Sequence, residues 1–238
     1  MSAPIILISN LAGGSGKTTT THSLAAASAE YGKNVLAIDT DPAATLTFRC
    51  GIENPRITIS ELIQKKFGIE PALVRSAERF SLLPSASRAA VADGENNSAA
   101  WDWVDEAAEM FDVIAIDTQS GPSLALLELS RLATHTVIPL EDSFLSLRGA
   151  LHTMDFLATA ENRNPTFFLP VKCEKLNQDL LNQLPSGVDL LEPGIRRDTA
   201  IVDAEVSTRS VLAAAPQSGA ASDYREISYS ILEKVGLF

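Results

Sequence analysis

Residues 10–19 read Asn-Leu-Ala-Gly-Gly-Ser-Gly-Lys-Thr-Thr, and this run joins a short apolar stretch to a stretch rich in alanine and threonine. The apolar stretch, residues 5–9, predicts a buried strand, and residues 17–31 predict a helix closed by Gly32. A glycine-rich turn at this position lets backbone N–H groups curl around phosphate oxygens, and the helix N-terminus adds partial positive charge. The run therefore predicts a phosphate-binding loop.

The loop carries side chains suited to a nucleotide and its metal ion. Lys17 would neutralise the β- and γ-phosphate oxygens, and the Thr18 hydroxyl would ligate Mg²⁺. The general phosphate-loop pattern has a glycine where this chain has Leu11, so the match is to a variant of the motif. The expected ligands of the loop are nucleotide phosphates and Mg²⁺. The predicted nucleotide-binding residues are Gly13, Gly14, Ser15, Gly16, Lys17, Thr18 and Thr19.

Beyond the loop, the chain alternates apolar runs with helical patterns. Further strands are expected at residues 34–38, 80–84, 113–116, 136–140, 166–171 and 188–191. Helices are expected at 60–66 (capped by Ser60), 97–110, 122–132 (with Pro122 in its first turn), 143–158, 177–184, 199–205 and 222–235. Strands that are apolar on both faces and separated by helices indicate an α/β fold with a doubly wound, mostly parallel sheet flanked by helices.

The organisation of the chain follows from its composition. The 238 residues are 45% hydrophobic and 21% charged, which excludes disorder for most of the chain. No linker divides it, so residues 1–238 are expected to form a single domain, with residues 85–99 as the most loop-like stretch. No apolar run approaches the ~18 residues of a membrane-spanning helix. With two cysteines in no metal-ligand spacing and no basic leader, a cytoplasmic protein with free thiols is expected.

Four segments together resemble the ParA/MinD family of ATPases. The loop is similar to the deviant Walker A box of this family, Lys-Gly-Gly-x-Gly-Lys-Thr-[Ser/Thr]. Residues 31–42, which end in Asp39-Thr40-Asp41-Pro42, are similar to its second strand and Asp-x-Asp-Pro switch. Residues 111–118 resemble its Walker B strand, and residues 136–149 resemble the next strand and helix. The resemblance is specific in the first 140 residues and loose in the rest.

The resemblance assigns roles to three aspartates. Asp41 would orient or activate the hydrolytic water, Asp39 would support the switch, and Asp117 would hold Mg²⁺ through water beside Thr18. Each aspartate ends a buried strand, where a carboxylate reaches the ligand crevice of a parallel sheet. From the residues alone, the competing interpretation of Asp39 and Asp41 is a pair of turn residues before Pro42, and that of Asp117 is a cap at the end of its strand. The predicted catalytic residues are Lys17, Asp41 and Asp39.

One position departs from the family pattern. The lysine that precedes the paired glycines in the family, and that crosses the dimer interface to the partner's nucleotide, is Ala12 here. The dimer would form without this contact, or another cation such as Arg148, Lys172 or Arg196 would substitute, or ATP would be bound and hydrolysed poorly. A small residue in an otherwise intact box also resembles the carboxysome-positioning subgroup of ParA-type ATPases.

The resemblance implies a nucleotide-driven switch with macromolecular partners. An ATP-bound homodimer would bind DNA without sequence preference, would be nucleoid-associated in the cytoplasm, and would position a carboxysome or a low-copy plasmid. An adaptor protein bound to the cargo would stimulate hydrolysis. The net charge is −11, so DNA binding requires a local basic patch. The candidate DNA-binding residues are Arg196, Arg197, Arg209 and Arg225.

Proteins of this fold also carry other functions. A membrane-bound member is disfavoured, because cations and acids nearly balance in residues 224–238. An iron–sulfur carrier is disfavoured by the positions of Cys50 and Cys173. The open alternatives are a metabolic P-loop enzyme acting on a small substrate and a nucleotide-binding interaction module without useful turnover.

Overall fold

The computed structural model describes residues 2–86, 98–161 and 164–238. Most of the predicted loop at 85–99 lies outside the described residues. Within them, eight strands form one sheet in the order β3-β4-β2-β5-β1-β6-β7-β8, and every pairing is parallel except that of β3 with β4. The strands are β1 (Ile5–Ile8), β2 (Val35–Asp39), β3 (Val74–Arg75), β4 (Ser81–Leu83), β5 (Val113–Asp117), β6 (His135–Leu140), β7 (Thr166–Pro170) and β8 (Asp189–Leu190).

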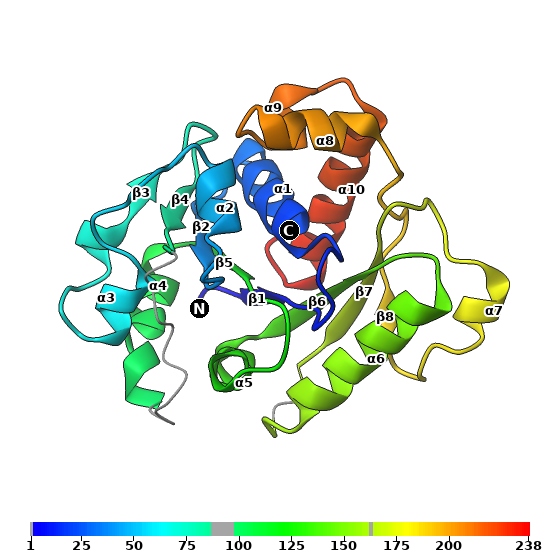
Figure 1. The fold of residues 1–238 in the computed structure, drawn as a ribbon, viewed down its shortest axis with the longest axis horizontal. Helices are drawn as coiled ribbons and strands as arrows, with labels where there is room; N and C mark the ends of the chain where they lie inside the picture. The colour runs from blue at the N-terminus through cyan, green and yellow to red at the C-terminus, as the bar shows by residue number, and fades with distance from the viewer. Residues whose placement is uncertain (1, 87–97, 162–163) are drawn as a thin grey trace.

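Helices cover both faces of this sheet (Figure 1). They are α1 (Lys17–Glu30), α2 (Thr45–Arg49), α3 (Ile59–Ile63), α4 (Trp103–Met110), α5 (Leu124–Leu132), α6 (Phe144–Ala158), α7 (Gln178–Leu181), α8 (Thr199–Val206), α9 (Val211–Ala214) and α10 (Gly219–Lys234), with short 3₁₀ turns at Glu70–Ala72 and Ser98–Trp101. The predicted α/β class, with a doubly wound and mostly parallel sheet, is confirmed.

The pleat of the central strands divides the core into two layers. In β1, Ile6 and Ile8 pack with α1 and α10, whereas Ile5 and Leu7 pack with α4 and α5 on the opposite face. Successive side chains of a strand point to opposite faces, so a strand covered on both sides must be apolar at every position. All four β1 residues are buried, as this argument requires.

Several element boundaries differ from the prediction. The first turn of α3 is capped by Thr58, whose hydroxyl accepts from the Ser60 N–H (3.3 Å) while Glu61 completes a capping box, so Ser60 lies inside the helix. Ser123 caps α5, and Pro122 therefore precedes the helix. The sequence pattern missed α2, α9 and β3, because elements of two to five residues show too few periods to identify.

A buried polar cluster ties the first helix to two distant segments. The Glu78 carboxylate, in the β3–β4 turn, lies 3.3 Å from His22 Nε2 on α1 and accepts from the Ser210 N–H at 2.8 Å. It also bonds the Ser210 hydroxyl, just before α9. Burial alone would raise the pKa of Glu78, but hydrogen bonds from His22 and Ser210 and the neighbouring His22 charge leave it lowered.

We expect Glu78→Gln to lower the free energy of unfolding by about 1–2 kcal/mol at pH 7, because the charge-assisted bonds are lost. A carboxyl whose folded pKa lies below its unfolded value stabilises the protein above the unfolded pKa, about 4.3 for glutamate, and this contribution disappears as pH falls through the folded pKa. Urea unfolding at pH 7 and at about pH 4 measures it. A difference that does not shrink at the lower pH would contradict the assignment.

Candidate functional site

A cavity of about 560 Å³ opens at the edge of the sheet where the parallel strands end. Ligands of open α/β sheets bind at this edge. The residues around the cavity come from the glycine-rich loop, from the segment after β2, from the loop after β7, and from α8 and α10. They include Gly14, Ser15, Gly16, Lys17, Thr18, Thr19, Asp41, Arg49, Ser120, Lys172, Arg197, Glu205 and Tyr224. Of the predicted nucleotide-binding residues, Gly13 alone is not in this lining.

The glycines give the phosphate loop its shape. Gly14 (φ 71°) and Gly16 (φ 88°) both have left-handed backbone, and Gly16 is the N-cap of α1. The Asn10 side chain anchors the start of the loop, since its amide donates to the Pro139 carbonyl (2.7 Å) and its Oδ1 accepts from the Ala12 N–H (2.9 Å). The loop is thus held open between β6 and α1, with the helix N-terminus facing the cavity.

The Lys17 side chain folds back over the phosphate loop toward its first residues. Its Nζ donates to the Ala12 carbonyl (3.1 Å) and to the Ser120 hydroxyl (3.0 Å), and the side chain is 6% exposed. Burial lowers the pKa of Lys17, while the charges of Asp117 and Asp41 oppose this shift. A buried ammonium beside a glycine-rich loop at a helix N-terminus is suited to an anion with several negative charges.

Two buried carboxyls lie side by side beneath the loop. Asp39 and Asp117 are paired in the β2–β5 register, and both side chains are inaccessible. Burial raises the pKa of both carboxyls; the Asp39 charge raises the pKa of Asp117 further, and the Asp41 charge raises that of Asp39. A dication nearby would favour their ionised forms.

The same neighbourhood fits a magnesium ion. The Thr18 hydroxyl donates to Asp117 Oδ2 (2.8 Å), which leaves its oxygen lone pairs free for a cation. Asp117 lies behind Thr18 and also accepts from the Thr21 hydroxyl (3.3 Å), so it would reach a metal through water. Within the described ranges no cluster of three or more His, Cys, Asp or Glu could hold a metal. The donor set therefore suits a hard ion held by one hydroxyl, phosphate oxygens and water.

Asp39 and Asp41, the two aspartates of the predicted switch, have different surroundings. Asp39 is committed to the fold, because its Oδ2 accepts from both the N–H (2.8 Å) and the hydroxyl (2.7 Å) of Thr47, on α2. Asp41 is half-buried, lines the cavity, and uses one oxygen to accept from the Ala43 N–H (2.8 Å). Asp41 therefore lies in the cavity wall, whereas Asp39 is bonded to Thr47 of α2.

Contacts that the sequence did not reveal complete the site. Ser120 holds Lys17, and Arg49 donates to the Thr19 hydroxyl (2.7 Å) while pairing with Glu205 on α8 (2.6 Å). Arg49 follows Asp41 by eight residues, so it links the segment that carries Asp41 to α8. No motif in the sequence marks this arginine, because its partners come from distant segments.

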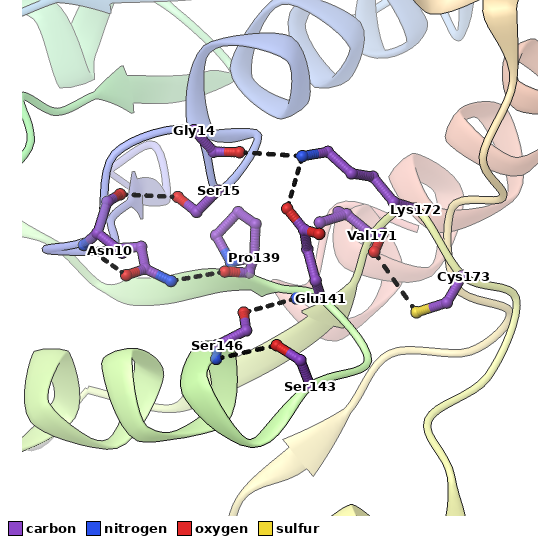
Figure 2. Close-up of polar contacts among 11 residues, drawn as sticks. Asn10, Gly14, Ser15, Pro139, Glu141, Ser143, Ser146, Val171, Lys172 and Cys173 are labelled. Carbon is purple, nitrogen blue, oxygen red and sulfur yellow. Dashed lines mark hydrogen bonds and ion pairs between the residues drawn. The ribbon is translucent and has the colours of Figure 1, made fainter.

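Of the three cations considered in place of the missing lysine, Lys172 lies at the phosphate loop. Its Nζ donates to the Gly14 carbonyl at 3.3 Å, as Figure 2 shows. Arg196 is held by both oxygens of Asp223 at 2.8 Å, and Arg148 is exposed and does not line the cavity.

The four candidate DNA-binding arginines have different surroundings. Arg196 pairs with Asp223, and Arg225 pairs with Glu30 at 2.7 Å. Arg197 is exposed and lines the 560 Å³ cavity. Arg209 is exposed and lines a second, small pocket, and Arg49 and Glu205 line both. Arg197 and Arg209 therefore flank α8, whose Val202 and Val206 are exposed.

Comparison with known proteins gives a consistent family. A family model described as an AAA domain (AAA_31) matches residues 3–168. A ParA family protein of Chlamydia trachomatis is 28% identical over 249 residues, covering 95% of this chain and 96% of its own length. Maintenance of carboxysome distribution protein A of Synechococcus elongatus is 29% identical over 161 residues, 64% of each chain.

Solved structures share the fold across nearly the whole chain. The septum site-determining protein MinD of Pyrococcus horikoshii, complexed with Mg-ADP, has a TM-score of 0.83 at 19% identity and covers 99% of this chain and 98% of its own. Cobyrinic acid a,c-diamide synthase of Mycobacterium smegmatis, with bound ADP and magnesium, has a TM-score of 0.80 at 24% identity, covering 97% and 94%. Among the residues placed by the structure, no helix has the length and apolar character needed to cross a membrane.

Proposed function

The chain belongs to the AAA-domain family as a ParA/MinD-like member, and from this premise we propose that it hydrolyses ATP with Mg²⁺ and uses the nucleotide to switch between a monomer and a DNA-binding homodimer. The observation that carries the proposal is that Lys17, Thr18 and Asp41 line one cavity at the phosphate loop, while the buried Asp117, paired in register with Asp39, accepts from the Thr18 hydroxyl behind it.

In this mechanism each residue acts through its observed position. Lys17 and the loop N–H groups bind the phosphate oxygens. Thr18 would hold Mg²⁺ directly and Asp117 would hold it through water, and the ion would supply positive charge beside the phosphates. Asp41 orients the attacking water from the cavity wall. Asp39 keeps α2, and so the backbone around Asp41, in place.

The nucleotide state would reach the DNA-binding surface through α8. Arg49 connects the Asp41 segment to Glu205, and Arg197 and Arg209 flank the same helix. In a dimer these arginines are doubled, which gives an acidic protein a local patch for DNA phosphates. Arg196 and Arg225 would have to leave Asp223 and Glu30 to contribute, so we assign them a smaller part.

For the cargo, we propose a carboxysome or a low-copy plasmid, attached through an adaptor protein that stimulates hydrolysis. The carboxysome assignment is supported by the likeness to the Synechococcus protein and by Ala12 in the loop. The plasmid assignment is supported by the likeness to a ParA family protein along nearly the whole chain. In either case the protein would be cytoplasmic and nucleoid-associated.

Fluorescence anisotropy of a labelled non-specific DNA duplex tests this function. We expect binding with Mg-ATP and none with ADP or without nucleotide. The affinity should fall at least tenfold between about 50 and 200 mM salt, because phosphate contacts release counterions. Arg209→Ala should weaken binding, whereas Arg56→Ala, an exposed arginine on the segment after α2, should not.

Absence of DNA binding in every nucleotide state would contradict the DNA switch. Phosphate release on addition of a small substrate would then support a metabolic enzyme, the class represented on this fold by the Mycobacterium synthase. ATP binding without phosphate release, with or without a partner, would support a nucleotide-binding interaction module.

A further inference from the structure

Two loops that follow neighbouring strands meet beside the phosphate loop. β6 and β7 are paired to their ends; Glu141 directly follows β6, and Lys172 is the second residue after β7. The Lys172 ammonium donates to Glu141 Oε1 at 2.5 Å and to the Gly14 carbonyl at 3.3 Å, so it links a carboxylate to the backbone of the phosphate loop (Figure 2). The same side chain lines the nucleotide cavity.

The backbone of Lys172 is strained in this position. Its φ is 59°, in the left-handed region that a side chain other than glycine rarely adopts. The flanking residues fix this conformation, since the Val171 N–H donates to the Leu140 carbonyl (2.8 Å) and the Cys173 N–H donates to the Ile195 carbonyl (3.0 Å). Val171 also lies under the loop, because a Cβ added at Gly16 would be 3.7 Å from its side chain. The strained residue therefore keeps a fixed relation to the phosphate loop.

The contacts of Lys172 can be exchanged. The side chains of Lys172 and Glu141 are 43% and 36% exposed, and half-exposed ion pairs contribute little to stability. A bound nucleotide brings several negative charges to the adjacent loop, and a bond from an ammonium to a phosphate oxygen is charge-assisted. The phosphate would also replace the neutral Gly14 carbonyl as an acceptor for the ammonium, and this carbonyl is the weaker of its two contacts.

Glu141 is placed to tolerate the loss of its partner. Its N–H donates to the Ser146 hydroxyl at the start of α6 (2.7 Å; Figure 2). Its carbonyl accepts from the N–H of Ser143, the N-cap of the same helix (2.7 Å). The free carboxylate would lie at the N-terminus of a fifteen-residue helix, where the helix dipole favours negative charge. The exchange would alter the charge beside Phe144 and Leu145, which are 56% and 79% exposed.

We propose that Glu141 and the nucleotide's phosphates compete for the Lys172 ammonium, so that Glu141 restrains nucleotide binding and Lys172 supplies a second phosphate-binding cation. The inference rests on the proposed function, since it takes ATP as the ligand. Lys172 is then a binding residue that reaches the phosphates from its own subunit, and Glu141 is a positioning residue that acts through it.

Isothermal titration of Mg-ATP into five proteins tests the competition. These are the wild type, Glu141→Gln, Lys172→Gln, the double variant, and Lys175→Gln as a control for an exposed lysine of the same loop. Lys172→Gln should weaken binding about tenfold, and Glu141→Gln should tighten it about threefold. In the Lys172→Gln background, Glu141→Gln should have no effect, because there is no ammonium to restrain. Lys175→Gln should bind as the wild type does.

The outcomes separate the two proposals. If the wild type binds Mg-ATP and Glu141→Gln binds it with the same affinity, the competition is overturned and the ATPase proposal stays intact. The same conclusion follows if Glu141→Gln still changes the affinity in the Lys172→Gln background. A wild-type protein that does not bind Mg-ATP would overturn both. An equal loss in Lys172→Gln and Lys175→Gln would show a general charge effect and would also overturn the competition.

Discussion

Lys17→Ala is expected to abolish ATP binding, with a loss of affinity of at least about a hundredfold. The reason is positional, because the Lys17 ammonium is the buried cation that lies inside the phosphate loop, bonded to the Ala12 carbonyl and the Ser120 hydroxyl. Removing it takes away a charge-assisted contact from a site where water cannot fully replace it. Titration calorimetry with Mg-ATP gives the dissociation constant directly.

Two controls keep this result interpretable. Lys175→Ala removes an exposed lysine elsewhere and should bind ATP normally. Circular dichroism should show that Lys17→Ala is folded, since removing a buried ammonium also removes its desolvation cost. If the folded variant bound ATP within about tenfold of the wild type, the phosphate-loop assignment would be wrong.

Asp41→Ala is expected to bind ATP with nearly unchanged affinity and to hydrolyse it about 10²–10³ times more slowly. Asp41 lines the cavity and its carboxylate accepts from the Ala43 N–H, so its removal should affect the attacking water more than phosphate binding. Single-turnover phosphate release, measured beside the ATP dissociation constant, separates the two effects.

The matched control is Glu53→Ala, which removes an exposed carboxylate from the segment after α2. Its turnover should equal that of the wild type. Normal turnover in Asp41→Ala would remove Asp41 from the mechanism, and a parallel loss of ATP binding would give it a structural part in the site instead.

The sequence supported those parts of the fold and site that depend on local patterns. The apolar runs located the central strands, because β1, β2 and β5 are buried on both faces. The glycine-rich run located the phosphate loop, because left-handed backbone at Gly14 and Gly16 requires glycine. Asp39 and Asp117 were expected at strand ends, and their registered pairing in the sheet follows from that position.

What the sequence could not supply depends on which loops the sheet brings together. Ser120, Arg49 and Glu141 belong to segments after different strands, and nothing in their local sequence marks their contacts with Lys17, Thr19 and Lys172. The same limit applied to the arginines. Arg196 and Arg225 are basic residues by composition, but the fold gives each a carboxylate partner from a distant helix.

The molar mass in solution shows whether ATP converts the monomer into a dimer. Light scattering coupled to size exclusion would compare the Asp41→Ala protein without nucleotide, with Mg-ADP and with Mg-ATP. We expect the mass of the 25.4 kDa chain in the first two conditions and twice that mass with Mg-ATP. A single mass in all three conditions, with ATP binding shown in the same samples, would contradict a switch driven by ATP.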